Sequence, residues 1–183
     1  MGQSVAHPST TPHPRPVVKR TARAILLDLP ADHPGAAAEL IVIKRTRPGH
    51  DPYWITPGGG VEPADRTVVD ALHREVDEEL GGKVVDVVPV FVDTVAHTHH
   101  DDGTLAHPHG VKVQHFFVCR LASMDPDRRH GPEVDEPQGE YEIVRLPFTR
   151  EGVTQVNLVP PSLRAFLAAN IEGVRAMLAP DLA

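Results

Sequence analysis

The sequence predicts a domain of the α/β or α+β class, in which a mixed sheet has one helix on each side. Several aliphatic runs have the length of strands, and residues 39–45 (ELIVIKR) are typical of a strand covered on both faces. An amphipathic helix at residues 68–80 interrupts these runs, and a second helical pattern follows the last of them. A chain of 183 residues can bury one core but is short of the usual two-domain size. We therefore expect a single domain, residues 17–183.

Composition argues against two classes of function. The 18 basic and 25 acidic residues give a formal net charge of -7, whereas a protein that coats a nucleic-acid polymer needs a basic face. No apolar run approaches the roughly 18 to 20 residues of a membrane helix. Cys119 is the only cysteine, so no internal disulfide can form and a reducing compartment fits best. We expect a cytoplasmic protein that binds neither membranes nor nucleic-acid polymers.

The first part of the chain divides into an arm and three strands. Residues 1–16 are rich in Pro, Ser, Thr and His and bury too little apolar surface to offset ordering, so we expect a flexible arm. Residues 17–29 and 39–45 are two aliphatic strands, separated by a loop that contains proline and glycine. Residues 53–56 form a short third strand that leads into Pro57.

Two residues near the end of this part are candidates to bind a substrate. Arg45 closes the second strand, where it can contact a phosphate; a solvated strand end is the alternative. Trp54 is one of few aromatic residues in the chain and can stack on a nucleobase; a core Trp that anchors its strand is the alternative.

The helix expected at residues 68–80 has a clear signal at each end. Thr67 can cap its N-terminus, and Gly81 stands where a left-handed C-terminal cap belongs. An apolar residue recurs at every fourth position: Val68, Leu72, Val76 and Leu80. We expect this apolar stripe to pack on the core.

Three glutamates share one face of this helix. At about 100° per residue, Glu75, Glu78 and Glu79 occupy positions i, i+3 and i+4, and Glu79 lies beside the apolar stripe. Like charges at this spacing repel each other, and Arg74 alone cannot neutralise all three. Hard divalent cations such as Mg²⁺ take carboxylate and phosphate oxygens as ligands. We therefore expect the three glutamates to bind Mg²⁺, with Mn²⁺ as an alternative metal.

Three glycines, Gly58, Gly59 and Gly60, precede the helix. Glycine lets a backbone approach a ligand closely and adopt a positive φ. We expect these residues to form a loop that binds a substrate phosphate; an ordinary turn is the alternative.

The stretch from Gly59 to Gly82 resembles the signature of the Nudix hydrolases, G-x5-E-x7-R-E-U-x-E-E-x-G-U, in which U is an aliphatic residue. The segment REVDEELG, which begins at Arg74, matches the R-E-U-x-E-E-x-G portion in full. There are three departures: Asp65 replaces the first Glu, one extra residue separates Asp65 from Arg74, and Gly82 replaces the last aliphatic residue. None of them changes the three helix glutamates.

The resemblance implies a fold and a reaction. It implies an α/β/α sandwich with a mixed sheet between helices, and hydrolysis of a nucleoside diphosphate linked to another group. Mg²⁺ held by three glutamates suits this reaction, because it can bridge phosphate oxygens, lower the pKa of a bound water and neutralise the leaving group. By analogy with the family, we also expect a small-molecule nucleotide substrate and a homodimer.

We assign roles to residues of the helix within this chemistry. Glu75, Glu78 and Glu79 are the expected metal ligands, and Arg74 is expected to orient Glu75 or Glu78. Glu75, Glu79 and Arg74 are therefore the predicted catalytic residues. The identity of the general base stays open. It can be Glu75 or Glu79, acting through a metal-bound water, or one of two acids of the last strand, Glu140 and Glu142.

The second half of the chain adds three strands. Residues 83–95 contain Pro89, which indicates an edge strand or two pieces that meet at a bend. Residues 111–121 alternate, so we expect His115 to be a hydrogen-bonded core histidine among apolar neighbours. Residues 140–146 form the last strand.

Two loops and a helix complete the chain. Residues 97–110 are rich in histidine, and residues 123–139 form a long charged loop that can serve as a lid, a specificity loop or a disordered segment. The C-terminal helix opens at Pro160 or Pro161 and carries an apolar face that extends to Leu178.

Two functions of other classes stay open. The departures at Asp65 and Gly82 leave room for a Nudix-like module that binds a nucleotide and cleaves it weakly or not at all. The histidines of residues 97–109 can also hold a transition metal such as Zn²⁺ or Ni²⁺, although their spacing fits no fixed ligand pattern.

Overall fold

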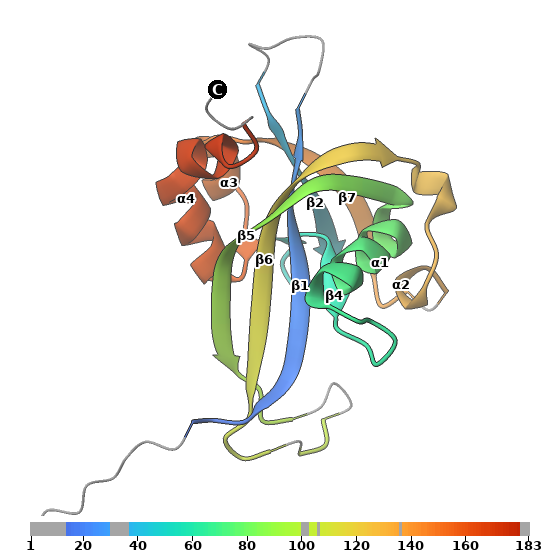
Figure 1. Ribbon diagram of the computed structural model, residues 1–183. Coiled ribbons are helices and arrows are strands. Elements are labelled where there is room, and N and C mark those ends of the chain that lie inside the picture. The colour runs from blue at the N-terminus through green and yellow to red at the C-terminus, as the bar shows by residue number, and fades with distance from the viewer. Residues whose placement is uncertain (1–13, 30–36, 100–102, 106, 136, 180–183) are drawn as a thin grey trace, which may run out of the picture.

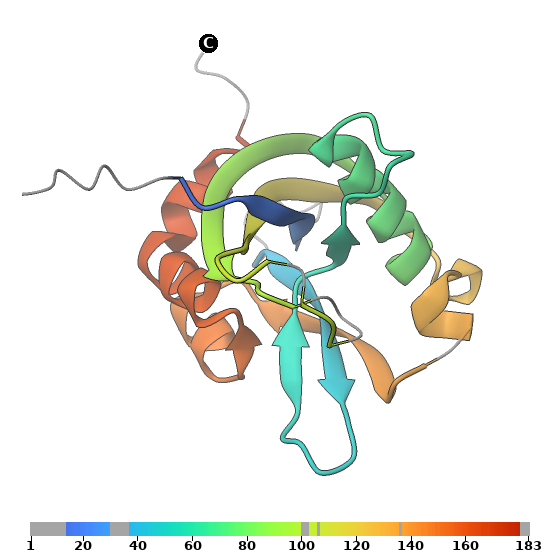
Figure 2. The same cartoon turned by 90° about the horizontal axis from the view of Figure 1, so that it is seen from below.

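The computed structural model describes residues 14–29, 37–99, 103–105, 107–135 and 137–179. The expected flexible arm therefore lies outside the described residues, apart from its last three positions. The described residues form a curled, mixed sheet with helix α1 on one side and helices α3 and α4 on the other (Figure 1). Figure 2 shows the same sheet curling between the two groups of helices. The predicted α/β/α sandwich with a mixed sheet is confirmed.

The elements follow one another in this order: β1 (Val17–Asp28), β2 (Glu39–Thr46), β3 (Tyr53–Ile55), β4 (Gly58–Gly60), α1 (Val68–Leu80), β5 (Gly82–Ala96), β6 (Val111–Met124), the 3₁₀ helix η1 (Pro126–Arg128), α2 (Pro132–Asp135), β7 (Glu140–Pro147), α3 (Arg150–Thr154), β8 (Leu158–Val159) and α4 (Pro161–Ala176). The long strands and both long helices agree with the sequence predictions. The elements that sequence did not predict have two to five residues, which is too short for a hydrophobic period to appear.

Strand β1 is the centre of the sheet and changes its partner along its length. One edge pairs in parallel with β6 from Val17 to Leu27. The other edge pairs antiparallel with β4, at Thr21 to Arg23, and then with β2, at Leu26 to Asp28. Strand β7 pairs with the far edge of β2, and β8 is parallel to β3. The first half of β1 is thereby held between β6 and the glycine strand β4.

Alternating side chains of the central strands fill two cores, one on each face of the sheet. In β1, Ile25 and Leu27 belong to the core that α4 covers, whereas Ala24 and Leu26 belong to the core that α1 covers. The strands β2 and β6 alternate in the same way, because successive side chains of a strand point to opposite faces. In β6 this differs from the predicted one-sided strand: Phe116 and its neighbours are buried on both faces.

Helix α1 begins and ends where the sequence predicts. The Thr67 hydroxyl accepts a hydrogen bond from the Asp70 N–H at 3.0 Å, and Gly81 adopts a left-handed φ of 58°. Leu72 and Leu80 are fully buried against the sheet, and each such side chain contributes about 2 kcal/mol of hydrophobic stabilisation. The helix is therefore fixed at both ends and along its apolar face.

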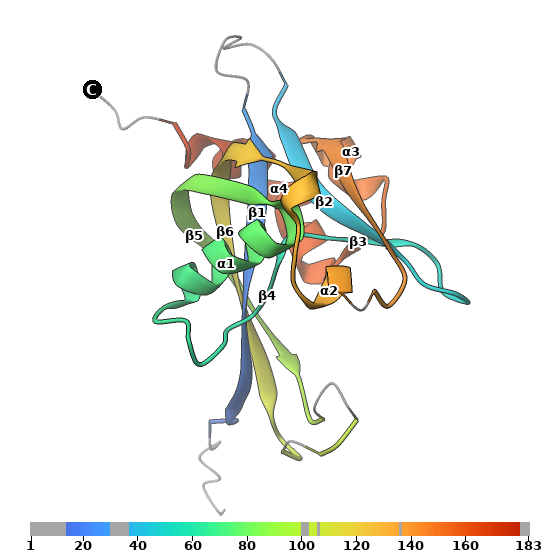
Figure 3. The same cartoon turned by 90° about the vertical axis from the view of Figure 1, so that its right-hand side faces the viewer.

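The long strands β5 and β6 continue past the helices, together with the first half of β1 (Figures 1 and 3). Strand β5 lies at the edge of the sheet and its pairing with β6 shifts on both sides of Pro89, so the predicted edge strand is confirmed. His115 of β6 is half-buried and bonds the Arg20 guanidinium at 3.2 Å, so it is hydrogen-bonded but less buried than predicted. Within the described residues, no helix is long and apolar enough to cross a membrane.

Candidate active site

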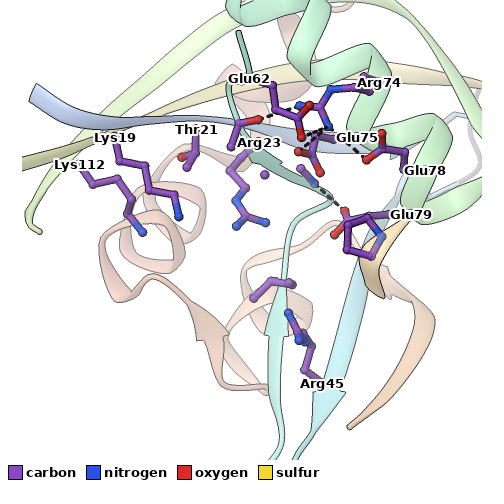
Figure 4. A pocket seen from close by; sticks show the side chains of 15 residues that line it. Lys19, Thr21, Arg23, Arg45, Glu62, Arg74, Glu75, Glu78, Glu79 and Lys112 are labelled. Carbon is purple, nitrogen blue, oxygen red and sulfur yellow. Dashed lines mark hydrogen bonds and ion pairs between the residues drawn. The ribbon is translucent and has the colours of Figure 1, made fainter. Parts of the chain in front are cut away.

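A pocket of about 290 Å³ opens between α1, β4 and the first half of β1 (Figure 4). Acidic side chains line one side of it: Glu62, Glu75, Glu78 and Glu79. Arg74 lies among them, and the other basic side chains of the lining lie beyond: Lys19, Arg23, Arg45 and Lys112. The pocket therefore brings the predicted helix glutamates together with four cations that lie far from them in the sequence.

Arg74 is the centre of a network of ion pairs on the acidic side. Its guanidinium donates to the Asp65 carboxylate twice, from Nε at 3.2 Å and from Nη2 at 3.0 Å. Nη1 donates to Glu75 Oε1 at 3.0 Å and to Glu78 Oε2 at 3.1 Å, while Nη2 also reaches the Gly60 carbonyl at 2.8 Å. Arg74 was expected to orient Glu75 or Glu78, and its guanidinium contacts both.

Asp65 is integrated into the site despite its departure from the Nudix signature. Its side chain is only 6% exposed and faces Arg74, and the second hydrogen bond to it comes from the Glu62 N–H at 2.8 Å. The hydrogen bond from Arg74, followed by the bond from Glu62, holds the pKa of the Asp65 carboxyl below its usual value. The extra residue in the preceding loop therefore does not prevent an acid from reaching Arg74.

Glu75 and Glu79 are buried and have different surroundings. Glu75 is 8% exposed, and its burial raises the pKa of the carboxyl, while the adjacent Arg74 opposes this shift. Glu79 is 4% exposed, and its Oε2 accepts a hydrogen bond from the Gly58 N–H at 2.7 Å. Both carboxylates are therefore held against the glycine strand, whereas Glu78 is more exposed, with 19% of its side chain accessible.

The three glycines form strand β4 and not the predicted loop. They pair with Thr21 to Arg23 of β1, because the edge of β1 offers backbone partners that a free loop would lack. A Cβ at Gly59 would lie 2.5 Å from Glu75 Oε1, and a Cβ at Gly58 would lie 2.1 Å from the Ala22 carbonyl oxygen. Gly58 therefore has no room for a side chain beside the β1 backbone, and a side chain at Gly59 would displace the Glu75 carboxylate.

The donor set of the pocket fits a hard divalent cation. Glu75, Glu78 and Glu79 offer only oxygen ligands, and the Glu75 carboxylate lies against Gly59, where a side chain would collide with it. Among the described residues, however, no three acidic, His or Cys side chains stand grouped as a ready metal site. Arg74 pairs with two of the glutamates and the third turns toward Gly58, so metal binding requires the carboxylates to reorient.

Sequence reasoning missed the basic residues that β1 and β6 contribute. Lys19 and Arg23 stand at alternate positions of β1 and face the pocket, and Lys112 of β6 is the register partner of Lys19. Arg23 is fixed by a hydrogen bond from Nη1 to the Thr56 carbonyl at 3.0 Å. The available signal was the run of polar residues from Lys19 to Arg23, broken only by Ala22, in a strand whose second half is aliphatic.

The remaining predicted residues divide between the pocket and other places. Arg45 lines the pocket, with its guanidinium 4.0 Å from the centre of the Tyr141 ring. Trp54 packs against the core covered by α4 and is not part of the lining, in agreement with the alternative of an anchoring core residue. Glu140 and Glu142 also lie outside the lining, and Glu142 pairs with Lys44 at 3.0 Å. Glu75 and Glu79 are the candidates for a general base within the pocket.

The segment after β6 folds against the pocket. It contains η1 and α2, and the His130 N–H donates to the Glu78 carbonyl at 3.0 Å. Pro132 of α2 lines the pocket itself. Of the three predicted roles for residues 123–139, the observed packing favours a lid or specificity loop over a disordered segment.

The histidine-rich segment shows no assembled metal site in the residues that the structure describes. The rings of His107 and His109 stand 6.3 Å apart, measured between centroids, and no third ligand joins them in the described part. His100, Asp101 and Asp102 lie outside the described residues.

The described residues form a mixed α/β/α sandwich in which three glutamates of one helix lie beside a glycine strand. The model of the NUDIX domain matches residues 19–150, which is most of the chain and includes the whole pocket-forming helix. The chain therefore belongs to the Nudix family.

Relatives support the same family at lower coverage. A protein of Escherichia fergusonii named nucleoside triphosphatase NudI is 46% identical over 54 residues, which is 28% of this chain and 38% of that protein. The protein of the same name from Salmonella schwarzengrund is 36% identical over 75 residues, 39% of this chain and 51% of that protein. The chain thus matches about half or less of the length of these curated relatives.

Solved structures show the same fold. A NUDIX hydrolase from Nitrosomonas europaea superposes with a TM-score of 0.56 at 18% identity, covering 82% of this chain and 86% of its own. A mutT/nudix family protein from Listeria innocua gives a TM-score of 0.52 at 18% identity, covering 88% and 96%.

Proposed function

We propose that this chain is a Mg²⁺-dependent hydrolase, also able to use Mn²⁺, that cleaves the pyrophosphate bond of a nucleoside diphosphate linked to another group. The observation that carries the proposal is the two-sided lining of the pocket, with carboxylates from α1 on one side and cations from β1 and β6 on the other. A pyrophosphate is negatively charged along its length, so it needs a cation at the acidic side and basic side chains beyond it.

The helix glutamates are the residues that would hold the metal. A bound divalent ion would bridge phosphate oxygens, lower the pKa of a water and neutralise charge on the leaving group. Glu75, Glu78 and Glu79 would supply the oxygen ligands, and the missing side chain of Gly59 lets the Glu75 carboxylate lie directly against the glycine strand. Arg74 fixes the helix carboxylates because Asp65 and the Gly60 carbonyl hold its guanidinium in place.

The side of the pocket that β1 and β6 form, the strand side, would bind the substrate phosphates next to the acidic side. Arg23 lies between the glutamates and the lysine pair, and its bond to the Thr56 carbonyl orients the guanidinium (Figure 4). Lys19 and Lys112 are register partners at the far end of the pocket, where they can attract the next anionic group of the substrate.

Proton transfer falls to a buried carboxylate of the helix. Glu79 is oriented by the Gly58 N–H, and Glu75 by Arg74, so each keeps a defined direction toward the pocket. A general base must lie within hydrogen-bond reach of the attacking water, and these are the two buried acids that line the pocket in the described residues.

Nucleotide binding with weak cleavage or none is the second candidate function. One observation favours it: Arg74 already pairs with Glu75 and Glu78, so two of the three proposed ligands are engaged. In such a module the cations of the pocket would bind the nucleotide without assembling a metal site.

A hydrolysis screen tests the proposal. Purified protein is incubated with nucleoside triphosphates, nucleotide sugars and dinucleoside polyphosphates, each with Mg²⁺, Mn²⁺ or EDTA, and the products are identified by mass spectrometry. We expect metal-dependent cleavage between two phosphates. Cleavage that EDTA leaves unchanged would contradict the proposal, and nucleotide binding without any turnover would establish the second candidate.

A further inference from the structure

A second pocket of about 320 Å³ adjoins the first and shares Arg23, Ile55 and Lys112 with it. Apolar side chains of β5, β8 and the residue before α4 form much of its wall, and Gln114 of β6 contributes an amide. Its volume lies at the lower end of the range of small-molecule sites, roughly 300 to 1,000 Å³. The two pockets are therefore continuous, with two cations at their boundary.

The buried polar residues of the protein gather at these two pockets. In the described part of the chain there are five of them: Thr21, Thr56, Glu75, Glu79 and Gln114. Each lines the first or the second pocket. Polar groups are buried at a cost unless they gain partners, so their concentration along one cleft indicates that a polar ligand supplies partners there.

Gln114 and Thr21 are buried polar residues that line neighbouring pockets. Gln114 is 5% exposed and lines the second pocket. Thr21 is 2% exposed and lines the first pocket, and its buried hydroxyl is without a partner in the described structure. The two are register partners on adjacent strands, so their side chains lie side by side on the same face of the sheet.

We propose that Gln114 recognises the polar edge of the substrate's nucleobase in the second pocket, that Thr21 beside it on β1 contacts the substrate from the first pocket, and that the preferred base is adenine. This inference rests on the proposed function, because it takes the first pocket as the site of the pyrophosphate. The phosphates then pass Arg23 and Lys112 at the boundary, and the base enters between apolar walls that suit its flat faces.

The chemistry of the amide decides the kind of base. A glutamine amide offers one donor group next to one acceptor, and this pair matches the N7 acceptor and N6 amino group of adenine. The corresponding edge of guanine offers two acceptors, which arginine or lysine pairs with better. When the base presents its N7 edge to the pocket, Gln114 therefore favours adenine over guanine, and the apolar walls alone would not distinguish them.

The test compares substrates with and without a base. Initial rates with Mg²⁺ are measured for ATP, GTP and inorganic tripolyphosphate, using wild type, Gln114→Leu and Thr21→Val. We expect Gln114→Leu to lower kcat/KM for ATP by about tenfold to a hundredfold, mainly through KM, and to leave tripolyphosphate unchanged. Gln155→Leu, which alters an exposed glutamine at the end of α3, is the matched control and should change nothing.

Each outcome decides a separate point. An unchanged ratio of ATP to tripolyphosphate in both variants would overturn the inference while hydrolysis itself stands. A wild-type preference for GTP would overturn the choice of adenine. If wild type cleaves none of the three compounds, calorimetric titration with ADP decides: weaker binding in Gln114→Leu, or in Thr21→Val should the first variant not fold, supports base recognition, and equal binding refutes it.

Discussion

The two sides of the first pocket are built in different ways. The acidic side comes from a single helix, where Glu75, Glu78 and Glu79 lie within five residues and share a face by helical spacing alone. The strand side comes from β1 and β6, and Lys19 meets Lys112 only because the two strands pair in a particular register. The side proposed to bind the metal is therefore a local property of the sequence, whereas the side proposed to bind the substrate is a property of the fold.

The two sides also differ in how their charges are held. On the helix, Arg74 joins Asp65, Glu75 and Glu78 in one network in which each partner restrains the others. On the strands, the backbone ladder fixes the positions and the side chains extend from it. Substitutions on the helix side should therefore affect the chemical step, and those on the strand side should affect substrate binding.

The largest effect is expected for Glu79→Gln. We expect the hydrolysis rate to fall by about a hundredfold, because the residue is a proposed metal ligand and a candidate base. The glutamine can still accept the hydrogen bond from Gly58, and the loss of carboxylate repulsion should leave the metal-free melting temperature unchanged or slightly higher. Steady-state kinetics and a thermal melt measure the two effects.

The matched control for Glu79→Gln is Asp70→Asn, which neutralises an exposed acid of the same helix outside the pocket. It should keep the wild-type rate. A wild-type rate in Glu79→Gln would remove this residue from the catalytic site and break the distinction between the two sides.

The next largest effect is expected for Asp65→Asn. The change weakens the two bonds that hold the Arg74 guanidinium, so Glu75 and Glu78 lose their fixed orientation. We expect kcat to fall by about tenfold to a hundredfold with little change in KM, as for other residues that orient metal ligands. Asp65→Glu should restore part of the rate, and equal rates in all three proteins would show that Arg74 needs no such partner.

A smaller effect is expected for Lys112→Gln on the strand side. The change removes one cation at the boundary of the two pockets, so KM should rise by about fivefold while kcat stays within twofold. The difference from wild type should shrink at high salt, because ions screen the attraction. Lys83→Gln, an exposed lysine of β5 outside the pocket, is the control. A loss of kcat in Lys112→Gln would place this residue in the chemical step and break the comparison.

No change in activity is expected for His115→Gln, which is the smallest effect of the series. His115 bonds Arg20, and these two alternate with the pocket residues Gln114 and Thr21, so they face away from the pocket.

Burial, together with the Arg20 charge, lowers the pKa of His115 in the folded protein. The unfolded chain therefore binds a proton more readily, and this residue makes the protein lose stability as the pH falls below about 6.5.

Thermal melts between pH 8 and pH 5 measure the contribution of His115. As the pH falls below about 6.5, the melting temperature of wild type should fall more than that of His115→Gln. Above pH 7 the melting temperatures of the two proteins should change with pH in the same way. The other histidines titrate in both proteins, so the difference isolates this one. Parallel curves would show that the environment of His115 does not disfavour its charged form.

The sequence was sufficient to predict the helix side of the site. The cap at Thr67, the left-handed Gly81 and the spacing of the glutamates are all local, and the structure agrees with each of them. The α/β/α fold also followed from the order of strands and helices together with the family signature. Local features can be predicted in this way because helical geometry depends on neighbours within a few residues.

The strand side could not be predicted from sequence, for a physical reason. Lys112 and Lys19 are separated by most of the domain, and their meeting depends on a parallel register that no local pattern encodes. The glycines were mistaken for a loop because Gly58 to Gly60 have no strand propensity, and only the free edge of β1 makes them a strand. Trp54 was placed among the binding residues by its chemistry, whereas packing directs it into the core.

The double pairing of β1 has a practical consequence for anyone who shortens the protein. The opening residues of this strand carry Lys19, Thr21 and Arg23, and the same backbone supports the glycines that contact Glu75 and Glu79. Proteolytic trimming or an expression boundary that passes Val17 would therefore disturb both sides of the proposed catalytic pocket at once. Tags and fusion partners belong upstream of that residue, with a spacer that leaves the strand free to pair.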